Sequence, residues 1–348
     1  NTTKYSSPVQ IPGTGWQTSS RTFSGTNYTS AAIKTDGTLW TWGSNEEGYL
    51  GQNTSTTDGA EAHRSSPTQV GTDTTWSNVS VGNQSVCATK TDGTLWIWGG
   101  NNSGALGLNQ SASPGPSIRQ SSPTQIPGTT WNKIESTFRR TYVIKTDGTL
   151  WSWGYNEYGY LGDNTGINRS SPVQVPGTTW SQVNGARYHT VAVKTDGTAW
   201  AWGYNGFGEL GHNNRSNYSS PTQIPGTTWS DISSGHYSSA GLKTDGTLWV
   251  WGHNQYGQMG QNQPNTSNIS SPTQVPGTTW SSMKMAEDYG MFAIKTDGTL
   301  WSWGDGGDGE LGHNNRTQYS SPTQVGSDSD WTSLQANASG GILAIKTL

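Results

Sequence analysis

The sequence contains few of the residues that several common classes of protein require. Cysteine occurs once, at Cys87, so no intrachain disulfide and no site built from several thiolates is possible. Only 12% of the residues are charged, and the net charge is −4 at pH 7. Because nucleic-acid affinity needs concentrated Lys and Arg, we predict no nucleic-acid partner. No apolar run reaches the roughly 18 residues of a membrane-spanning helix, so we also predict no membrane insertion.

Glycine and tryptophan, in contrast, are abundant, with 47 and 19 copies among 348 residues. Mixed with Ser, Thr and Asn, they favour turns and short half-buried strands over helices. Every Trp belongs to a repeat of about 50 residues, a period typical of propellers and other repeat arrays. The tripeptide Ser-Ser-Pro marks seven repeats, which start at Ser6, Ser65, Ser121, Ser170, Ser219, Ser270 and Ser320.

One repeat is enough to predict four short strands. Residues 180–186 and 189–195 form the first two, and "TAWAWG" at residues 198–203 forms the third. Asp196–Gly197 between the last two is a strong tight-hairpin signal, in which both positions favour a positive φ. The prolines in residues 219–225 suit an outer edge strand, the fourth. We call these the inner, second, third and outer strands.

Sheets of this size cannot cover their own two faces, but radially arranged copies cover one another. The sequence therefore predicts an all-β fold, a seven-bladed β-propeller of four-stranded antiparallel blades. The two Trp of each third strand, such as Trp200 and Trp202, share one face of the strand and are expected to fill the space between blades. We predict a single domain over residues 1–348, with repeats 6–64, 65–120, 121–169, 170–218, 219–269, 270–319 and 320–348.

The seventh blade is expected to be closed by both termini and to lack its own third strand. Its outer strand would be residues 6–11, and its inner and second strands would be residues 331–336 and 342–346. Three outcomes remain open for the missing strand. It lies outside this piece of chain, the blade closes with three strands, or another chain donates the strand and so links molecules by self-assembly.

The run "DGTLWSWGxNxxGxLG" after an "AIKT"-like strand resembles the repeat of the regulator of chromosome condensation family. The resemblance covers essentially the whole chain and implies a seven-bladed propeller. In its low charge and its near-identical repeats, the chain resembles bacterial, phage or environmental members of the family more than nuclear ones.

Candidate chemical sites are weak. The acidic loop at residues 305–312 has the composition of a Ca²⁺ loop, but its counterparts are "YNEYGYLG", "YNGFGELG" and "HNQYGQMG". The frame is therefore interpreted as structural, and the acids of residues 305–312 as local substitutions. His212 and His313 occupy equivalent places and lack a third metal ligand. No nucleophile–base set stands out. We therefore predict no enzyme activity, no catalytic residues, no metal and no cofactor.

The strand order places the second-to-third and outer-to-inner turns on one face of the disc, and the other two sets of loops on the opposite face. The turns repeat almost verbatim, whereas the inner-to-second loops differ from repeat to repeat. Variable loops on a rigid scaffold are typical binding sites, and aromatic and Arg residues are typical hot spots. The candidate binding residues are Arg21, Phe23, Phe138, Arg139, Arg140, Arg187, Tyr188, His189, His236, Tyr237 and Tyr289.

These observations predict a non-enzymatic recognition or structural propeller, outside the cell or on a virion surface, that binds a protein or glycan through the variable loops. Two alternatives follow from the resemblance. One is nucleotide exchange on a small GTPase with chromatin binding, as in the eukaryotic namesake, and the acidic balance weighs against it. The other is a secreted inhibitor of enzymes such as β-lactamases.

Overall fold

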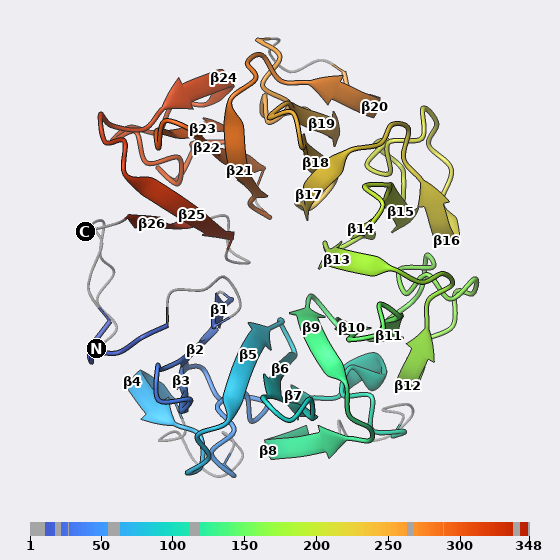
Figure 1. Cartoon of the computed structure of the whole chain (residues 1–348), viewed down its shortest axis with the longest axis vertical. Helices are drawn as coiled ribbons and strands as arrows, with labels where there is room; N and C mark the ends of the chain where they lie inside the picture. Colours follow the sequence, from blue (N-terminus) through green and yellow to red (C-terminus); the bar gives the residue numbers. More distant parts are fainter. Residues whose placement is uncertain are drawn as a thin grey trace.

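The computed structural model describes residues 11–17, 22–26, 28–54, 63–110, 119–262, 267–287, 289–336 and 342–346. Within them the chain forms six four-stranded sheets and one two-stranded sheet. Figure 1 shows the sheets placed around a central axis in chain order. The fold is the all-β, seven-bladed propeller that the repeat predicts.

Each complete blade contains four consecutive strands, and the sheet order equals the chain order. The first blade consists of β1 (Phe23–Gly25), β2 (Thr29–Ile33), β3 (Leu39–Gly43) and β4 (Arg64–Gln69). The second consists of β5 (Trp76–Val81), β6 (Ser85–Lys90), β7 (Leu95–Gly100) and β8 (Arg119–Ile126), with a short 3₁₀ helix, η3 (Asn102–Gly104), after β7. The third consists of β9 (Trp131–Ser136), β10 (Arg140–Lys145), β11 (Leu150–Gly154) and β12 (Arg169–Gln174).

The remaining blades keep the same spacing. The fourth consists of β13 (Trp180–Gly185), β14 (His189–Lys194), β15 (Ala199–Gly203) and β16 (Tyr218–Gln223). The fifth consists of β17 (Trp229–Ser234), β18 (Ser238–Lys243), β19 (Leu248–Gly252) and β20 (Ile269–Gln274). The sixth consists of β21 (Trp280–Met285), β22 (Gly290–Lys295), β23 (Leu300–Gly304) and β24 (Tyr319–Gln324), and the seventh sheet contains β25 (Trp331–Ala336) and β26 (Ile342–Lys346). The four strands predicted in the fourth repeat agree with β13–β16 to within two residues.

The two Trp of a third strand have different surroundings. Trp202 is fully buried, and its Nε1–H donates to the carbonyl of Tyr160 in the preceding blade at 2.8 Å. Trp200 is half-buried, and both rings lie about 6 Å from Trp180 of the same blade, at 6.1 and 6.0 Å. Trp180 and Trp202 also pack on Tyr142 of the third blade. The expected filling between blades is confirmed for the second Trp, and the structure extends the pair to a triad.

The Lys-Thr-Asp-Gly turn has a definite role in this triad. Asp196 Oδ1 accepts hydrogen bonds from Thr198 N and Oγ1, at 2.9 and 2.7 Å, and Thr198 Oγ1 accepts one from Trp200 Nε1. Lys194 Nζ lies 4.7 and 4.4 Å from the ring centroids of Trp180 and Trp200. The expected turn role of Asp is confirmed, but Lys makes cation–π contacts as well as contributing surface charge.

The hairpin geometry differs from the expected two-residue turn with two positive φ angles. Gly197 N donates to Lys194 O, and Lys194 N donates to Thr198 O, so three residues form the turn. Only Gly197 has a positive φ, of 78°. A three-residue hairpin needs one left-handed residue, which glycine supplies without strain.

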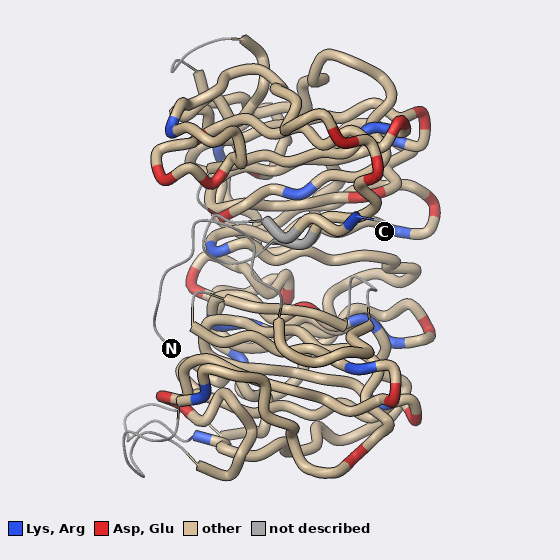
Figure 2. The backbone as a smooth tube through the Cα atoms, turned by 90° about the vertical axis from the view of Figure 1, so that its left-hand side faces the viewer, with Lys and Arg blue, Asp and Glu red and all other residues tan. Residues whose placement is uncertain are grey.

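The two faces of the disc are as predicted. On one side the Asp-Gly turn contacts the outer-to-inner turn of the next blade, since Trp229 N donates to Gly197 O. On the other side the inner-to-second and third-to-outer loops are joined, since Tyr204 N donates to Tyr188 O. We call these the turn face and the loop face. Figure 2 shows acidic and basic positions interspersed over the edge of the disc that it presents.

The seventh sheet confirms part of the prediction for the chain ends. β25 and β26 are antiparallel neighbours, with Leu334 opposite Ala344. The expected outer strand at residues 6–11 lies, except for Ile11, outside the described residues. Closure by both termini, the missing third strand and strand donation therefore stay predictions.

Candidate functional site

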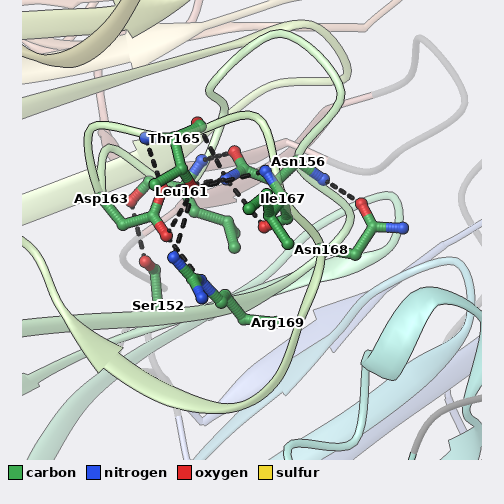
Figure 3. A network of polar contacts seen from close by, with 8 residues as sticks. All are labelled: Ser152, Asn156, Leu161, Asp163, Thr165, Ile167, Asn168 and Arg169. Atoms are coloured by element: carbon green, nitrogen blue, oxygen red, sulfur yellow. Dashed lines mark hydrogen bonds and ion pairs between the residues drawn. The ribbon is translucent and has the colours of Figure 1, made fainter.

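In five of the six complete blades the third-to-outer loop is held by one buried Asn, and in the sixth Gly306 takes its place (Figure 3). In the third blade Asn156 Oδ1 accepts from Leu161 N at 2.8 Å, and Asn156 Nδ2 donates to Asp163 Oδ1 and to the carbonyl of Ile167. The same Asn-to-i+5 bond recurs at Asn45, Asn101, Asn205 and Asn254. The repeated "NxxGxLG" is therefore a rigid frame for the loop.

Two positions of this loop, the residue before the Asn and the second residue after it, vary between repeats. In the third, fourth and fifth blades both positions are aromatic, whereas in the first, second and sixth they are Ser, Gly, Asp or Glu. The six aromatic residues are Tyr155, Tyr158, Tyr204, Phe207, His253 and Tyr256. The frame thus presents aromatic side chains on one sector of the loop face.

The inner-to-second loops of the same sector add further rings. The ring centroids of Tyr188 and Tyr237 lie 4.8 Å apart with nearly parallel planes, and His236 stacks on Tyr237 at 4.5 Å. His236 in turn stacks on Tyr289 at 5.8 Å. Offset stacking of this kind stabilises aromatic pairs beyond the area that they bury.

Rings from the two sets of loops form one connected group. Phe207 lies 4.7 Å from Tyr237, and Tyr256 lies 4.8 Å from Tyr289. We call the whole group the aromatic ribbon, and it extends over four adjacent blades. Its members are Phe138, Tyr158, Tyr188, Tyr204, Phe207, His236, Tyr237, His253, Tyr256 and Tyr289.

Tyr289 has a backbone conformation that is unusual for its residue type, with φ at 66°. Most other non-glycine residues with positive φ are recurring frame positions, six Asn after the Leu-Gly or Met-Gly pair and three Thr before the inner-strand Trp. Tyr289 is not part of either set. A bulky residue held in this region costs about 1–3 kcal/mol and points to a functional position.

Arginines lie at the third-blade end of the ribbon. The guanidinium carbons of Arg139 and Arg187 lie 5.0 and 4.7 Å from the ring centroid of Phe138. Arg140 is fully buried beneath them, 4.3 Å from the ring centroid of Tyr160. Its Nη2 donates to the carbonyls of Ala186 and Arg187, which fixes the shape of the neighbouring loop.

Burial keeps the histidines of this sector neutral. His189 is fully buried, and burial, with Arg140 nearby, lowers its pKa to about 3. His189 Nε2 lies 2.7 Å from Ser239 Oγ, in hydrogen-bond contact. Burial and the charge of Arg187 lower the pKa of His236 to about 4. The positive charge of this sector at neutral pH therefore comes from arginine.

A channel of about 710 Å³ runs along the inner strands and carries charges of both signs. Lys133, Glu135, Asp231 and Lys284 all line it. Enclosure within the channel raises the pKa of Glu135 to about 7, although Lys284 opposes the shift, and Asn184 Nδ2 donates to Glu135 Oε1. Phe138 lies at the channel and in the ribbon, so the two features adjoin.

A family model described as an RCC1-like domain matches residues 2–345. The chain belongs to this family. Human WBSCR16 has a similar structure, with a TM-score of 0.76 and 19% identity over 90% of this chain and 83% of the other. Prp20p from Saccharomyces cerevisiae, in a study of its binding to Gsp1p and histones, also has a TM-score of 0.76, with 16% identity over 94% and 82% of the two chains. Likeness at such identities shows the RCC1-like fold and nothing finer.

In this RCC1-like chain, seven of the eleven predicted binding residues lie together at the loop face. These are Phe138, Arg139, Arg187, Tyr188, His236, Tyr237 and Tyr289. Arg140 and His189 have no exposed surface, so the structure places them as supports beneath the loops. Arg21 lies outside the described residues.

Phe23 was expected in a loop, but it lies in β1 opposite Ala32. The first strand continues to Gly25, which pairs with Ser30 as Gly185 pairs with Thr190 in the fourth blade. The Phe23 ring lies 6.0 Å from Trp42 and lines the channel, apart from the ribbon.

Sequence reasoning missed the ribbon members from the third-to-outer loops. We interpreted the segments "YNEYGYLG", "YNGFGELG" and "HNQYGQMG" as structural frame, which is correct for Asn, Gly and Leu only. The signal lay at the two variable positions within each segment, which become aromatic in three consecutive repeats.

The described ranges contain no group of three or more His, Cys, Asp or Glu side chains that could hold a metal ion. His212 Nε2 instead contacts Thr222 O, and His313 Nε2 contacts Ser302 Oγ, within their own blades. No helix in these ranges has the length and apolarity needed to cross a bilayer.

Proposed function

We propose that this RCC1-like chain is a non-catalytic recognition propeller that binds a protein or glycan through the aromatic ribbon. The observation that carries the proposal is the connected set of rings, most of them half-buried, over four blades of the loop face. Tyr and Arg contribute more binding energy at interfaces than most residues, and these are fixed by a rigid frame before any partner arrives.

We further propose that the protein acts outside the cell or on a virus particle. Support comes from the low charged fraction of 12% and from an abundance of Ser, Thr and Asn, which suit an exposed adhesive or scaffolding surface. Attachment of the particle or cell to its partner is then the role of the loop face.

The proposal is tested by screening the full chain against a displayed random-peptide library and a glycan array. Replacing Tyr188 and Tyr237 together by Ser should lower the affinity for the selected ligands by about 30-fold or more, because both rings are central in the ribbon. Lys194→Gln on the turn face is the control and should leave binding unchanged. The proposal would be refuted if the selected ligands bound the double Tyr variant as tightly as the original chain but no longer bound Lys194→Gln.

An inhibitor of a secreted enzyme such as a β-lactamase is the second candidate, favoured by the position of Phe138 at both ribbon and channel. Nucleotide exchange on a small GTPase remains the alternative that the family resemblance suggests. Inhibition and exchange assays with the purified chain separate these two activities from simple recognition.

A further inference from the structure

Three arginines meet where the third and fourth blades adjoin on the loop face. Arg139 and Arg187 both lie over Phe138, and Arg140 beneath donates to the carbonyl of Arg187 at 2.6 Å. The guanidinium groups of Arg139 and Arg187 therefore meet at one ring, although they come from two different loops, and that of Arg140 lies against the main chain of the second loop. We call Arg139, Arg140 and Arg187 the arginine cluster.

Several N–H groups of the cluster are buried without a hydrogen-bond acceptor. They are Nε of Arg139, Nε and Nη1 of Arg140, and Nε of Arg187. Among the described residues, none of the ion pairs with a carboxylate within 4.0 Å involves any of the three. Buried charged donors without partners are costly, so the positive charge of the cluster is left uncompensated within the protein. Arg139 and Arg187 are half-buried, so part of each side chain stays open to a partner.

Two other arginines next to the loop face show the usual arrangement. Arg119 Nε lies 2.6 Å from Glu47 Oε2, and Arg169 Nε lies 2.6 Å from Asp163 Oδ2. Both pairs lie within loop-face loops or at the strands that follow them. The arginine cluster differs in having three cations and no such carboxylate in the described part of the chain.

We propose that the arginine cluster binds a carboxylate side chain presented by the partner protein, with Arg139 and Arg187 donating to its two oxygens. The planar guanidinium forks match a carboxylate, and stacking on Phe138 already holds them in place. Arg140 supplies fixed positive charge from below. The inference rests on the proposed recognition function and names the chemistry of its partner.

The neighbouring rings favour a protein over an acidic glycan. Tyr188, Tyr237 and His236 stack on one another at centroid distances of 4.5–5.2 Å. Their faces therefore cover each other, whereas a sugar ring needs an open aromatic face to pack upon. Ring edges, Tyr hydroxyl groups and guanidinium forks remain for the partner, which is the composition of a protein hot spot.

The test titrates the full chain with three probes at low salt: a capped hexaglutamate peptide, a capped hexaglutamine peptide and hexagalacturonate. Saturable binding of hexaglutamate alone is the expected result, and it requires no variant. Binding should raise the pKa of His236, because a carboxylate near Arg187 offsets the charge that lowers it. NMR of the imidazole follows this shift.

Variants locate the site. Arg187→Gln should lower the affinity for hexaglutamate about tenfold or more, and Arg187→Lys should lower it less. Arg215→Gln is the matched control, because Arg215 is an exposed arginine of a loop-face loop outside the cluster. Equal losses for Arg187→Gln and Arg215→Gln would overturn the proposal, as would no binding of hexaglutamate or binding of hexagalacturonate alone.

Failure of this inference differs from failure of the proposed function. A library ligand that is lost when Tyr188 and Tyr237 are replaced, but is unaffected by Arg187→Gln, would overturn the carboxylate site. The same result would support recognition by the ribbon.

Discussion

The turn face and the loop face are made by the same repeats, yet they use side chains differently. On the turn face Lys, Asp, Thr and Trp contact one another in the same way in blade after blade, as in Lys145, Lys194 and Lys243 over their Trp rings. On the loop face only the Asn frame recurs, and the side chains that it presents change from blade to blade. Repetition therefore marks the contacts that build the disc, and variation marks the surface that we propose for recognition.

The largest effect on the free energy of unfolding is expected in β15, whose two Trp side chains form hydrogen bonds at opposite faces of the disc. Trp202 donates to Tyr160 O in a loop-face loop, whereas Trp200 donates to Thr198 Oγ1 in a turn-face hairpin. Trp202→Ala should reduce the free energy of unfolding by about 3–5 kcal/mol, because its ring is fully buried between blades. Trp200→Ala should cost less, since that ring is half-buried. Denaturant titration measures both, and equal losses would contradict the difference between the two rings.

A second difference concerns pH. The turn-face carboxyl of Asp196 has its pKa lowered by the Thr198 hydrogen bonds, so its contribution to stability is present above pH 3.8 and is lost on acidification. Glu209, beneath the ribbon, has its pKa raised to about 8 by burial. Its contribution is present below pH 4.5, where the unfolded chain is also protonated, and is lost as the pH rises to about 8.

The Glu209 prediction has a natural control in the next blade. Gln258 occupies the equivalent position and accepts from Tyr256 N, as Glu209 accepts from Phe207 N. Glu209→Gln should therefore fold. In the original chain the free energy of unfolding should fall by on the order of 2–4 kcal/mol between pH 4.5 and 8 because of Glu209, and in the variant this decrease should be absent. Denaturation at a series of pH values tests this. An unchanged pH profile would show that Glu209 is not its source.

The smallest effect is expected from a single cation of the turn face. Lys194→Gln removes the contacts with Trp180 and Trp200 and should cost about 0.5–1 kcal/mol, the usual range for exposed cation–π pairs. Thermal unfolding checks the loss. A cost similar to that of Trp202→Ala would mean that the turn face contributes far more to stability than the contacts indicate.

The fold was predictable because the same strands and turns recur in several repeats. Features that occur by chance in one repeat can therefore be told apart from those that all repeats share. The aromatic sector of the loop face was predictable in part, since variable aromatic loops stand out against constant turns. Arg140 and His189 were placed at the surface because they end a loop in sequence. In the sheet they begin second strands, opposite Gly154 and Gly203, and their side chains are fully buried. Sequence alone does not give that pairing.

In the second to sixth blades the second Trp of the third strand donates to the preceding blade, and this bond has a consequence for how such proteins diversify. In all five the acceptor is a main-chain carbonyl, and the residues that supply it are Tyr49, Ala105, Tyr160, Glu209 and Gln258. Because this hydrogen bond does not depend on the side chain of the acceptor residue, it can form between blades of different sequence. Whole blades can then be duplicated or exchanged in evolution, each bringing its own loops, without a matching change in the blade beside it.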